Sequence, residues 1–66
     1  MHPMYRWEIS RGQTVRIRPK ALPFQPDPGP LTVTEWPCKG LLQAYVRCRT
    51  QEGRDLWFRP EELRPS

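Results

Sequence analysis

Residues 44–63, AYVRCRTQEGRDLWFRPEEL, decide the fold of this chain. The stretch predicts a β-hairpin, because two runs of alternating apolar and polar residues flank a loop at Gln51-Glu52-Gly53. Glycine readily takes the left-handed conformation that such a loop needs at its last position. Pairing through this loop sets Arg49 opposite Asp55, Cys48 opposite Leu56, Arg47 opposite Trp57, Val46 opposite Phe58 and Tyr45 opposite Arg59.

The predicted hairpin has one apolar face and one basic, aromatic face, since side chains alternate between the two sides of a strand. We expect the apolar face to form the core, and it consists of Val46, Cys48, Leu56 and Phe58. We expect the opposite face to lie at the surface, and it consists of Tyr45, Arg47, Arg49, Asp55, Trp57 and Arg59. An ion pair between Arg49 and Asp55 is expected on this second face.

Two segments before the hairpin also have the alternation of strands. Residues 14–18 are ended by Pro19, and residues 31–36 are rich in β-branched side chains. Core residues should face core residues, as a half-buried sheet requires. A tight turn at Lys39-Gly40 then predicts the pairs Val33 with Val46, Leu31 with Cys48, Thr34 with Tyr45 and Thr32 with Arg47.

Glu35 conflicts with this alternation, because its position assigns a carboxylate to the apolar side of the strand. Two interpretations are open. Glu35 lies at the rim of the fold and pairs with an arginine, or a β-bulge near Trp36 resets the alternation.

The last residues predict a helical turn and a short final strand. Pro60 suits the first position of a 3₁₀ or α turn over residues 60–63, and Glu61 and Glu62 favour its positive N-terminal end. We expect Leu63 to plug the end of the core. Residues 64 and 65 are expected to add a last short strand beside the first.

The chain of 66 residues predicts one domain, with an N-terminal arm or short strand over residues 1–11 and a barrel over residues 12–66. Residues 19–30, PKALPFQPDPGP, carry five prolines and therefore predict an extended, polyproline-like loop. We expect Leu22 and Phe24 to fold back onto the barrel. The loop is either a functional segment or a stiff cover over one end of the core.

The pattern GQTVRIRP, a proline-rich loop, LTVTEW and AYVRCRTQEGRDLWFRPEELRP resembles the SH3-like barrels over about residues 12–65. This group includes KOW and Tudor-like domains and the small barrel subunits of photosynthetic electron-transfer complexes. The resemblance implies an all-β fold, a small barrel of 4–5 antiparallel strands with one helical turn near residues 60–63, and a binding or docking module. The residues that carry it are Gly12, Val15, Arg16, Phe58 and Leu63.

The chain also departs from its SH3-like relatives. The proline-rich loop stands where KOW domains have a glycine-containing turn. The aromatic sets of methyl-lysine readers and of proline-peptide readers have no counterpart in this sequence. The resemblance therefore implies binding without naming what is bound.

The charge of the chain points to acidic partners. The formal net charge is +4, and nine of the eleven cationic residues are arginine, which makes planar contacts to carboxylates and phosphates. Nucleic acid, an acidic protein face or a membrane surface would attract such a chain. The sequence contains no apolar run of membrane-spanning length and opens without the apolar core of a signal peptide, so we expect a cytoplasmic protein without membrane insertion.

No catalytic residue, cofactor or metal site is predicted. Glu61 and Glu62 point in different directions in a helical turn and are expected to be helix-start charges rather than an acid–base pair. Cys48 is expected in the core and Cys38 in an exposed turn, so their Cβ atoms would not meet in a disulfide. With His2 as the one histidine, a zinc site lacks ligands. An enzyme is expected only if identical barrels form a site between them.

The remaining functional prediction is the basic, aromatic surface. Arginines among flat rings suit an acidic protein partner, because these residue types dominate binding hot spots. They also suit single-stranded nucleic acid, whose phosphates need cations and whose bases stack on rings. A third interpretation is an ordinary solvated face with cation–π contacts. We expect a non-enzymatic docking module for a larger assembly, with nucleic-acid binding as the alternative. The candidate residues are Arg16, Arg18, Trp36, Tyr45, Arg47, Arg49, Trp57 and Arg59.

Overall fold

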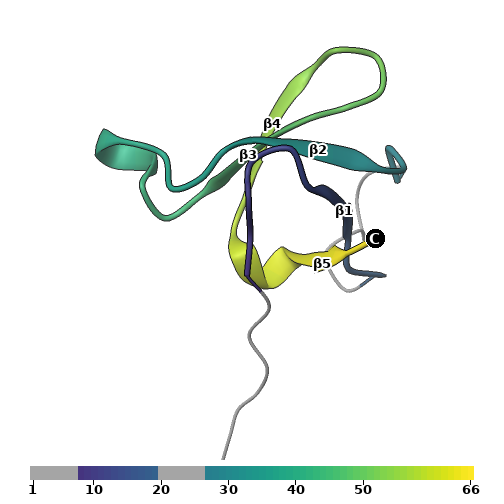
Figure 1. Ribbon diagram of the computed structural model, residues 1–66, viewed down its shortest axis with the longest axis horizontal. Coiled ribbons are helices and arrows are strands. Elements are labelled where there is room, and N and C mark those ends of the chain that lie inside the picture. Colours follow the sequence, from purple (N-terminus) through teal and green to yellow (C-terminus); the bar gives the residue numbers. More distant parts are fainter. Residues whose placement is uncertain (1–7, 20–26) are drawn as a thin grey trace, which may run out of the picture.

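In the computed structural model, which describes residues 8–19 and 27–66, the chain forms an antiparallel sheet of five strands (Figure 1). The order of the strands in the sheet is β4-β3-β2-β1-β5. The strands are β1 (Thr14–Ile17), β2 (Leu31–Glu35), β3 (Val46–Arg49), β4 (Asp55–Phe58) and β5 (Leu63–Pro65). Two 3₁₀ turns, η2 (Gly40–Leu42) and η3 (Pro60–Glu62), complete the described elements. The predicted all-β class is therefore confirmed.

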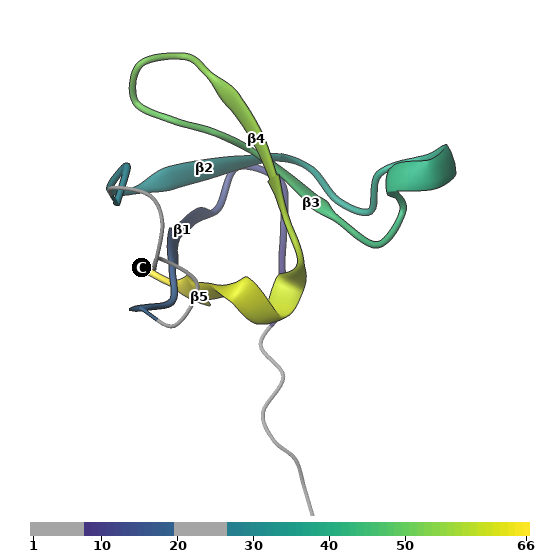
Figure 2. The same cartoon turned by 180° about the vertical axis from the view of Figure 1, so that it is seen from behind.

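The sheet curls around its core but is not closed into a barrel. Ladders join β4 to β3, β3 to β2, β2 to β1 and β1 to β5, and within the described residues none joins β4 to β5. Figure 2 shows that η3 connects these two outer strands at the open side. The prediction of a barrel is wrong in this respect, because residues 60–62 take the 3₁₀ conformation instead of extending β4.

The predicted hairpin and C-terminal elements are confirmed. β3 and β4 pair with Arg47 opposite Trp57 and Arg49 opposite Asp55, as the loop at residues 51–53 requires. η3 begins with proline, and the Glu62 carboxylate accepts a hydrogen bond from the Arg59 backbone at 2.8 Å. The final strand pairs with β1, and the Leu63 side chain is completely buried.

The predicted register between β2 and β3 is wrong by two residues. Val33 lies opposite Cys48 rather than Val46, and Thr32 lies opposite Arg49. The cause is the connection: residues 36–45 contain η2 and are longer than the tight turn that we expected at Lys39-Gly40. Because a shift of two residues preserves the alternation of faces, the same side chains still reach the core.

A β-bulge between Val33 and Glu35 resolves the conflict at Glu35. The register changes there, so that Glu35 lies opposite Arg47 on the outer side of the sheet. The Glu35 carboxylate is 3.7 Å from the Arg47 guanidinium. Both interpretations of Glu35 are thus correct, since the bulge resets the alternation and the side chain pairs with an arginine. One residue later, Trp36 packs partly buried against the core.

The core lies inside the curl of the sheet. Cys38 is also buried, with 6% of its surface exposed, so the prediction of an exposed thiol is wrong. Both cysteines are free thiols. The buried core cluster consists of Val15, Ile17, Leu31, Val33, Val46, Cys48 and Leu63, with Ile9, Trp36 and Phe58 packed against it.

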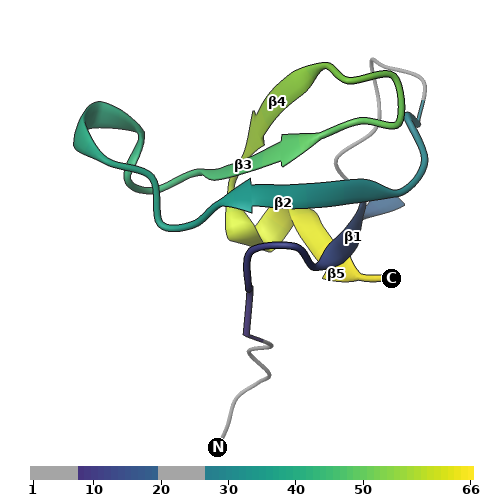
Figure 3. The same ribbon diagram turned by 45° about the horizontal axis from the view of Figure 1, so that its top comes forward.

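The remaining predictions fall largely outside the described residues. Of the N-terminal arm, residues 1–7 lie outside them, while Ile9 packs against the core. Leu22 and Phe24 of the proline-rich loop also lie outside them. Figure 3 shows that the β3–β4 hairpin and the connection carrying η2 project from opposite ends of the sheet.

Candidate binding face

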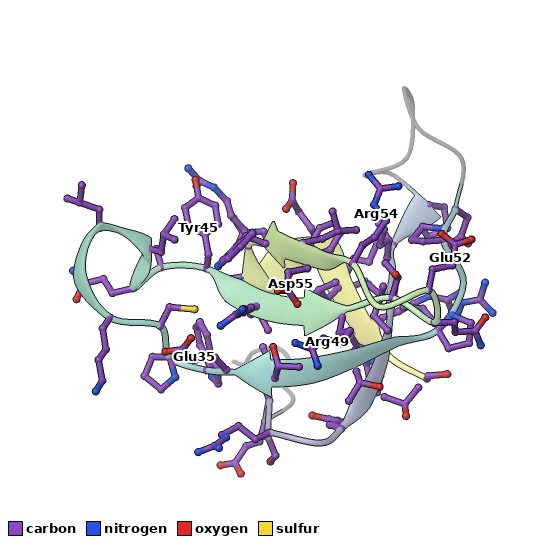
Figure 4. The ribbon with its side chains drawn as sticks, turned by 90° about the horizontal axis from the view of Figure 1, so that it is seen from above. Glu35, Tyr45, Arg49, Glu52, Arg54 and Asp55 are labelled. Atoms are coloured by element: carbon purple, nitrogen blue, oxygen red, sulfur yellow. The ribbon has the colours of Figure 1, made fainter. Side chains whose placement is uncertain are left out.

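The outer face of β3 and β4 is the candidate binding face, and we use that name for the side chains of Tyr45, Arg47, Arg49, Asp55, Trp57 and Arg59. Alternation along the two strands directs these side chains away from Val46 and Cys48, which are buried in the core. In Figure 4, Tyr45 and Glu35 lie toward the η2 end, and Glu52 and Arg54 lie at the hairpin tip. Asp55 and Arg49 lie between these two ends.

Asp55 organises the arginines of this face. Its two carboxylate oxygens accept hydrogen bonds from Arg47 at 2.8 Å and from Arg49 at 3.2 Å. The Arg47 hydrogen bond, helped by Arg49, holds the pKa of Asp55 below its usual value. The pKa of Arg47 is raised in turn, chiefly by its hydrogen bond to Asp55 and further by Glu35. Arg47 is therefore held between two carboxylates.

Two arginine–aromatic contacts lie on the same face. The guanidinium carbon of Arg47 is 5.6 Å from the centre of the Trp57 ring. That of Arg59 is 5.8 Å from the centre of the Tyr45 ring, the pairing expected from the hairpin register. Trp57 keeps 41% of its surface exposed, so one large ring remains available to a partner.

The formal charges of the candidate binding face are balanced. Arg59 is 3.8 Å from Glu61, which adds a third carboxylate to Asp55 and Glu35. Three arginines therefore meet three acids, and the face is less basic than its own residues suggest. Ion pairs this exposed add little to stability, but they orient the guanidinium groups.

The structure does not bring all of the predicted site residues together. Arg16 and Arg18 lie on and just after β1, which β2 separates from β3. Arg16 pairs with Asp27 at 3.0 Å, and the Arg18 side chain donates to the Leu63 carbonyl at 3.0 Å. Asp27 has a lowered pKa, caused first by the Gly29 backbone N–H and then by Arg16. These two arginines are thus engaged elsewhere on the molecule.

Trp36 belongs to a separate open pocket that the sequence did not predict. The pocket has a volume of about 300 Å³ and lies where the turn before β1 meets the end of β2. Its cations, Arg11 and Lys39, both lie in irregular segments, where no alternation of residues marks a face. The lining residues are Arg11, Thr34, Glu35, Trp36, Pro37 and Lys39.

The thiols offer no reactive group at the surface. Burial raises the pKa of Cys48 to about 11, with a further contribution from Cys38. A thiol in this state is a small apolar side chain rather than a nucleophile. Within residues 8–19 and 27–66, no three histidine, cysteine or acidic side chains lie close enough to hold a metal ion.

Comparisons with protein-family models, with curated proteins and with solved structures give no match to this chain. In the part of the chain that the structure describes, no helix combines the length and apolar character that crossing a membrane requires.

Proposed function

We propose that this chain is a non-enzymatic docking module of the cytoplasm, which binds an acidic surface of a larger protein assembly through the candidate binding face. The observation that carries the proposal is the exposed Trp57 ring with the fixed Arg47 guanidinium over it. Tryptophan and arginine are the residue types most often found at the energetic centre of protein interfaces.

The fixed position of Arg47 supports this proposal further. Its contacts to Asp55 and Glu35 hold the long side chain in place before any partner arrives. An interface loses free energy when it must order such side chains on binding, so a group already held costs less to bind. Trp57 and Arg47 together therefore make a pre-organised contact.

Arg49 and Arg59 are the groups expected to contact the acidic partner. Their side chains are 52% and 59% exposed, against 36% for Arg47. Each has only one carboxylate partner, so its guanidinium keeps donors that a second carboxylate can use. The net charge of +4 would attract an acidic surface before contact.

Nucleic-acid binding, the alternative function, has weaker support on this face. The three arginines already meet three carboxylates, and these would repel phosphates. Arginines also lie over Tyr45 and Trp57, the rings on which bases would stack. Protein docking is therefore the preferred function.

The SH3-like resemblance is kept as part of the proposal. The last strand lies beside the first, and the other strands follow in chain order, which is the arrangement expected of the proposed relatives. The open side between β4 and β5 departs from a closed barrel. The resemblance supports a binding role and adds no partner.

The proposal is tested by co-purification of the tagged full chain from its own cells. We expect a specific acidic protein to be recovered with the wild type and lost with Trp57→Ala and with Arg49→Glu. Arg54→Ala is the matched control, because it removes an exposed cation at the hairpin tip. Circular dichroism confirms that each variant is folded.

Two results would contradict the proposal. The first is full recovery of the partner with both Trp57→Ala and Arg49→Glu. The second is binding of a labelled single-stranded oligonucleotide that weakens steeply between about 50 and 200 mM salt and is lost in Trp57→Ala, which would favour the nucleic-acid alternative.

A further inference from the structure

The pocket beside Trp36 has one wall fixed by a turn that is bonded to β2. The Gln13 N–H donates to the Ser10 carbonyl at 3.1 Å and closes a turn around Arg11 and Gly12. Gly12 has φ of +86°, which side-chain-bearing residues rarely adopt. Its N–H donates to the Val33 carbonyl at 2.7 Å. These bonds hold the backbone of Arg11 beside the end of β2.

The opposite wall is fixed by the buried thiol of Cys38. Cys38 points inward, and its sulfur is 3.9 Å from the Glu35 carbonyl. Its neighbours Pro37 and Lys39 are consequently exposed, and both line the pocket. Trp36 contributes a half-buried ring between the two walls. The pocket therefore combines an anchored aromatic ring with a cation from each side.

Neither cation has an ion-pair partner. All seven acidic residues of the chain lie within the described residues, and none is within 4.0 Å of a charged nitrogen of Arg11 or Lys39. The one acid in the pocket, Glu35, is shared with Arg47 at 3.7 Å. The lining thus carries two positive charges and one negative charge that is already partly balanced.

We infer that this pocket binds a carboxylate side chain from an acidic peptide segment, with an adjoining apolar side chain lying on the Trp36 ring. Arg11 and Lys39 would bind the carboxylate from opposite walls. Glu35 disfavours a doubly charged phosphate more than a singly charged carboxylate, since like charges repel in proportion to their product. The volume of about 300 Å³ is at the low end for small-molecule sites and suits one or two side chains.

The pocket is continuous with the candidate binding face. Glu35 lines the pocket and pairs with Arg47, while the Thr34 hydroxyl donates to the Arg47 carbonyl at 3.2 Å. A segment of the acidic partner seated in the pocket would therefore continue toward Trp57. The inference rests on the proposed function for its partner, and it adds the part of that partner which the pocket recognises.

The test is a titration of the ¹⁵N-labelled full chain, followed by NMR. The probe is the capped peptide Gly-Glu-Phe-Gly, and its control replaces glutamate with glutamine. We expect the glutamate peptide to shift the Arg11 and Lys39 amides and the Trp36 indole N–H. The double variant Arg11→Ala/Lys39→Ala should weaken binding at least about fivefold, since each exposed contact contributes up to about 1 kcal/mol.

Three outcomes of the titration would overturn the inference. The first is equal weakening by Arg54→Ala, which removes one cation far from the pocket. The second is equal binding of the glutamine peptide. The third is a thymidine oligonucleotide that shifts the same signals at lower concentration than the peptide, which would assign the pocket to phosphate.

The co-purification assay separates this inference from the proposed function. Loss of the partner in Trp57→Ala but not in Arg11→Ala/Lys39→Ala would leave the docking function standing and overturn the role of the pocket. Retention of the partner in Trp57→Ala, with peptide binding still localised at Trp36, would support the pocket and contradict docking through the candidate binding face.

Discussion

Arg47 and Trp57 lie opposite each other across β3 and β4, with the Arg47 guanidinium carbon 5.6 Å from the centre of the Trp57 ring. The same guanidinium binds the Asp55 carboxylate at 2.8 Å. Arg49 shares that carboxylate but is the more exposed of the two arginines. The two arginines of β3 thus have different roles, since Arg47 fixes the surface and Arg49 is open to a partner.

This difference predicts unequal effects of two similar substitutions. Arg47→Ala should lower the melting temperature more than Arg49→Ala, because it removes the partner of Glu35 and the cation over Trp57. After Arg49→Ala, Asp55 keeps its shorter bond to Arg47. Thermal unfolding followed by circular dichroism measures both variants. Equal melting temperatures for the two would show that the contacts of Arg47 contribute nothing beyond those of Arg49.

The stability of the protein should fall at acid pH. Asp55 and Asp27 both have pKa values lowered in the folded state by bonded partners. Their ionised forms therefore stabilise the fold above the unfolded aspartate pKa of about 3.9, and this is lost as the pH falls through the lower folded value. Urea unfolding at a series of pH values tests this. Asp55→Asn should flatten the acid limb, and an unchanged limb would exclude Asp55 as its source.

Two leucines should respond very differently to truncation. Leu63 is completely buried, so Leu63→Ala should cost about 2–5 kcal/mol. A core this small supplies only about 3–5 kcal/mol, so most of the variant should be unfolded at room temperature. Leu41 is fully exposed in η2, and Leu41→Ala should change the free energy of unfolding by less than about 0.5 kcal/mol. A folded, stable Leu63→Ala would contradict the position of Leu63 in the core.

The two thiols should be unreactive in the folded protein. Cys48 is fully buried with its pKa raised to about 11, and Cys38 is buried at the base of the η2 connection. A thiol-specific chromogenic reagent at neutral pH should label neither quickly, and labelling of both should accelerate in denaturant. Rapid labelling of one thiol without denaturant would mean that Cys38 faces solvent, as the sequence alone suggested.

The sequence predicts those parts of the fold that depend on local alternation. The β3–β4 register follows from side-chain parity and one glycine loop, and the structure has the same pairs, such as Val46 with Phe58. The register of β2 depends instead on the length of the connection to β3. That connection contains η2, and the sequence has no periodic signal for it. Alternation therefore decided the faces but not the pairs.

The candidate site shows the same division. Alternation placed Tyr45, Arg47 and Trp57 on one face, but it could not show that carboxylates from other elements balance the arginines. Glu35 reaches Arg47 only because of the bulge in β2. Arg11 and Lys39 meet at one pocket through turn geometry that lies beyond any repeating pattern. Contacts between irregular segments are the part that the sequence did not predict.

The open side of the sheet has a consequence for self-association. β4 and β5 each have a side that no described strand covers, and such edges can pair with a second copy of the chain and aggregate. β5 has only three residues, and its Pro65 has no N–H to donate. β4 has four residues and is followed one residue later by Pro60, which interrupts further pairing. Short edges bounded by proline thus protect an incompletely closed sheet from fibril-like stacking at high concentration.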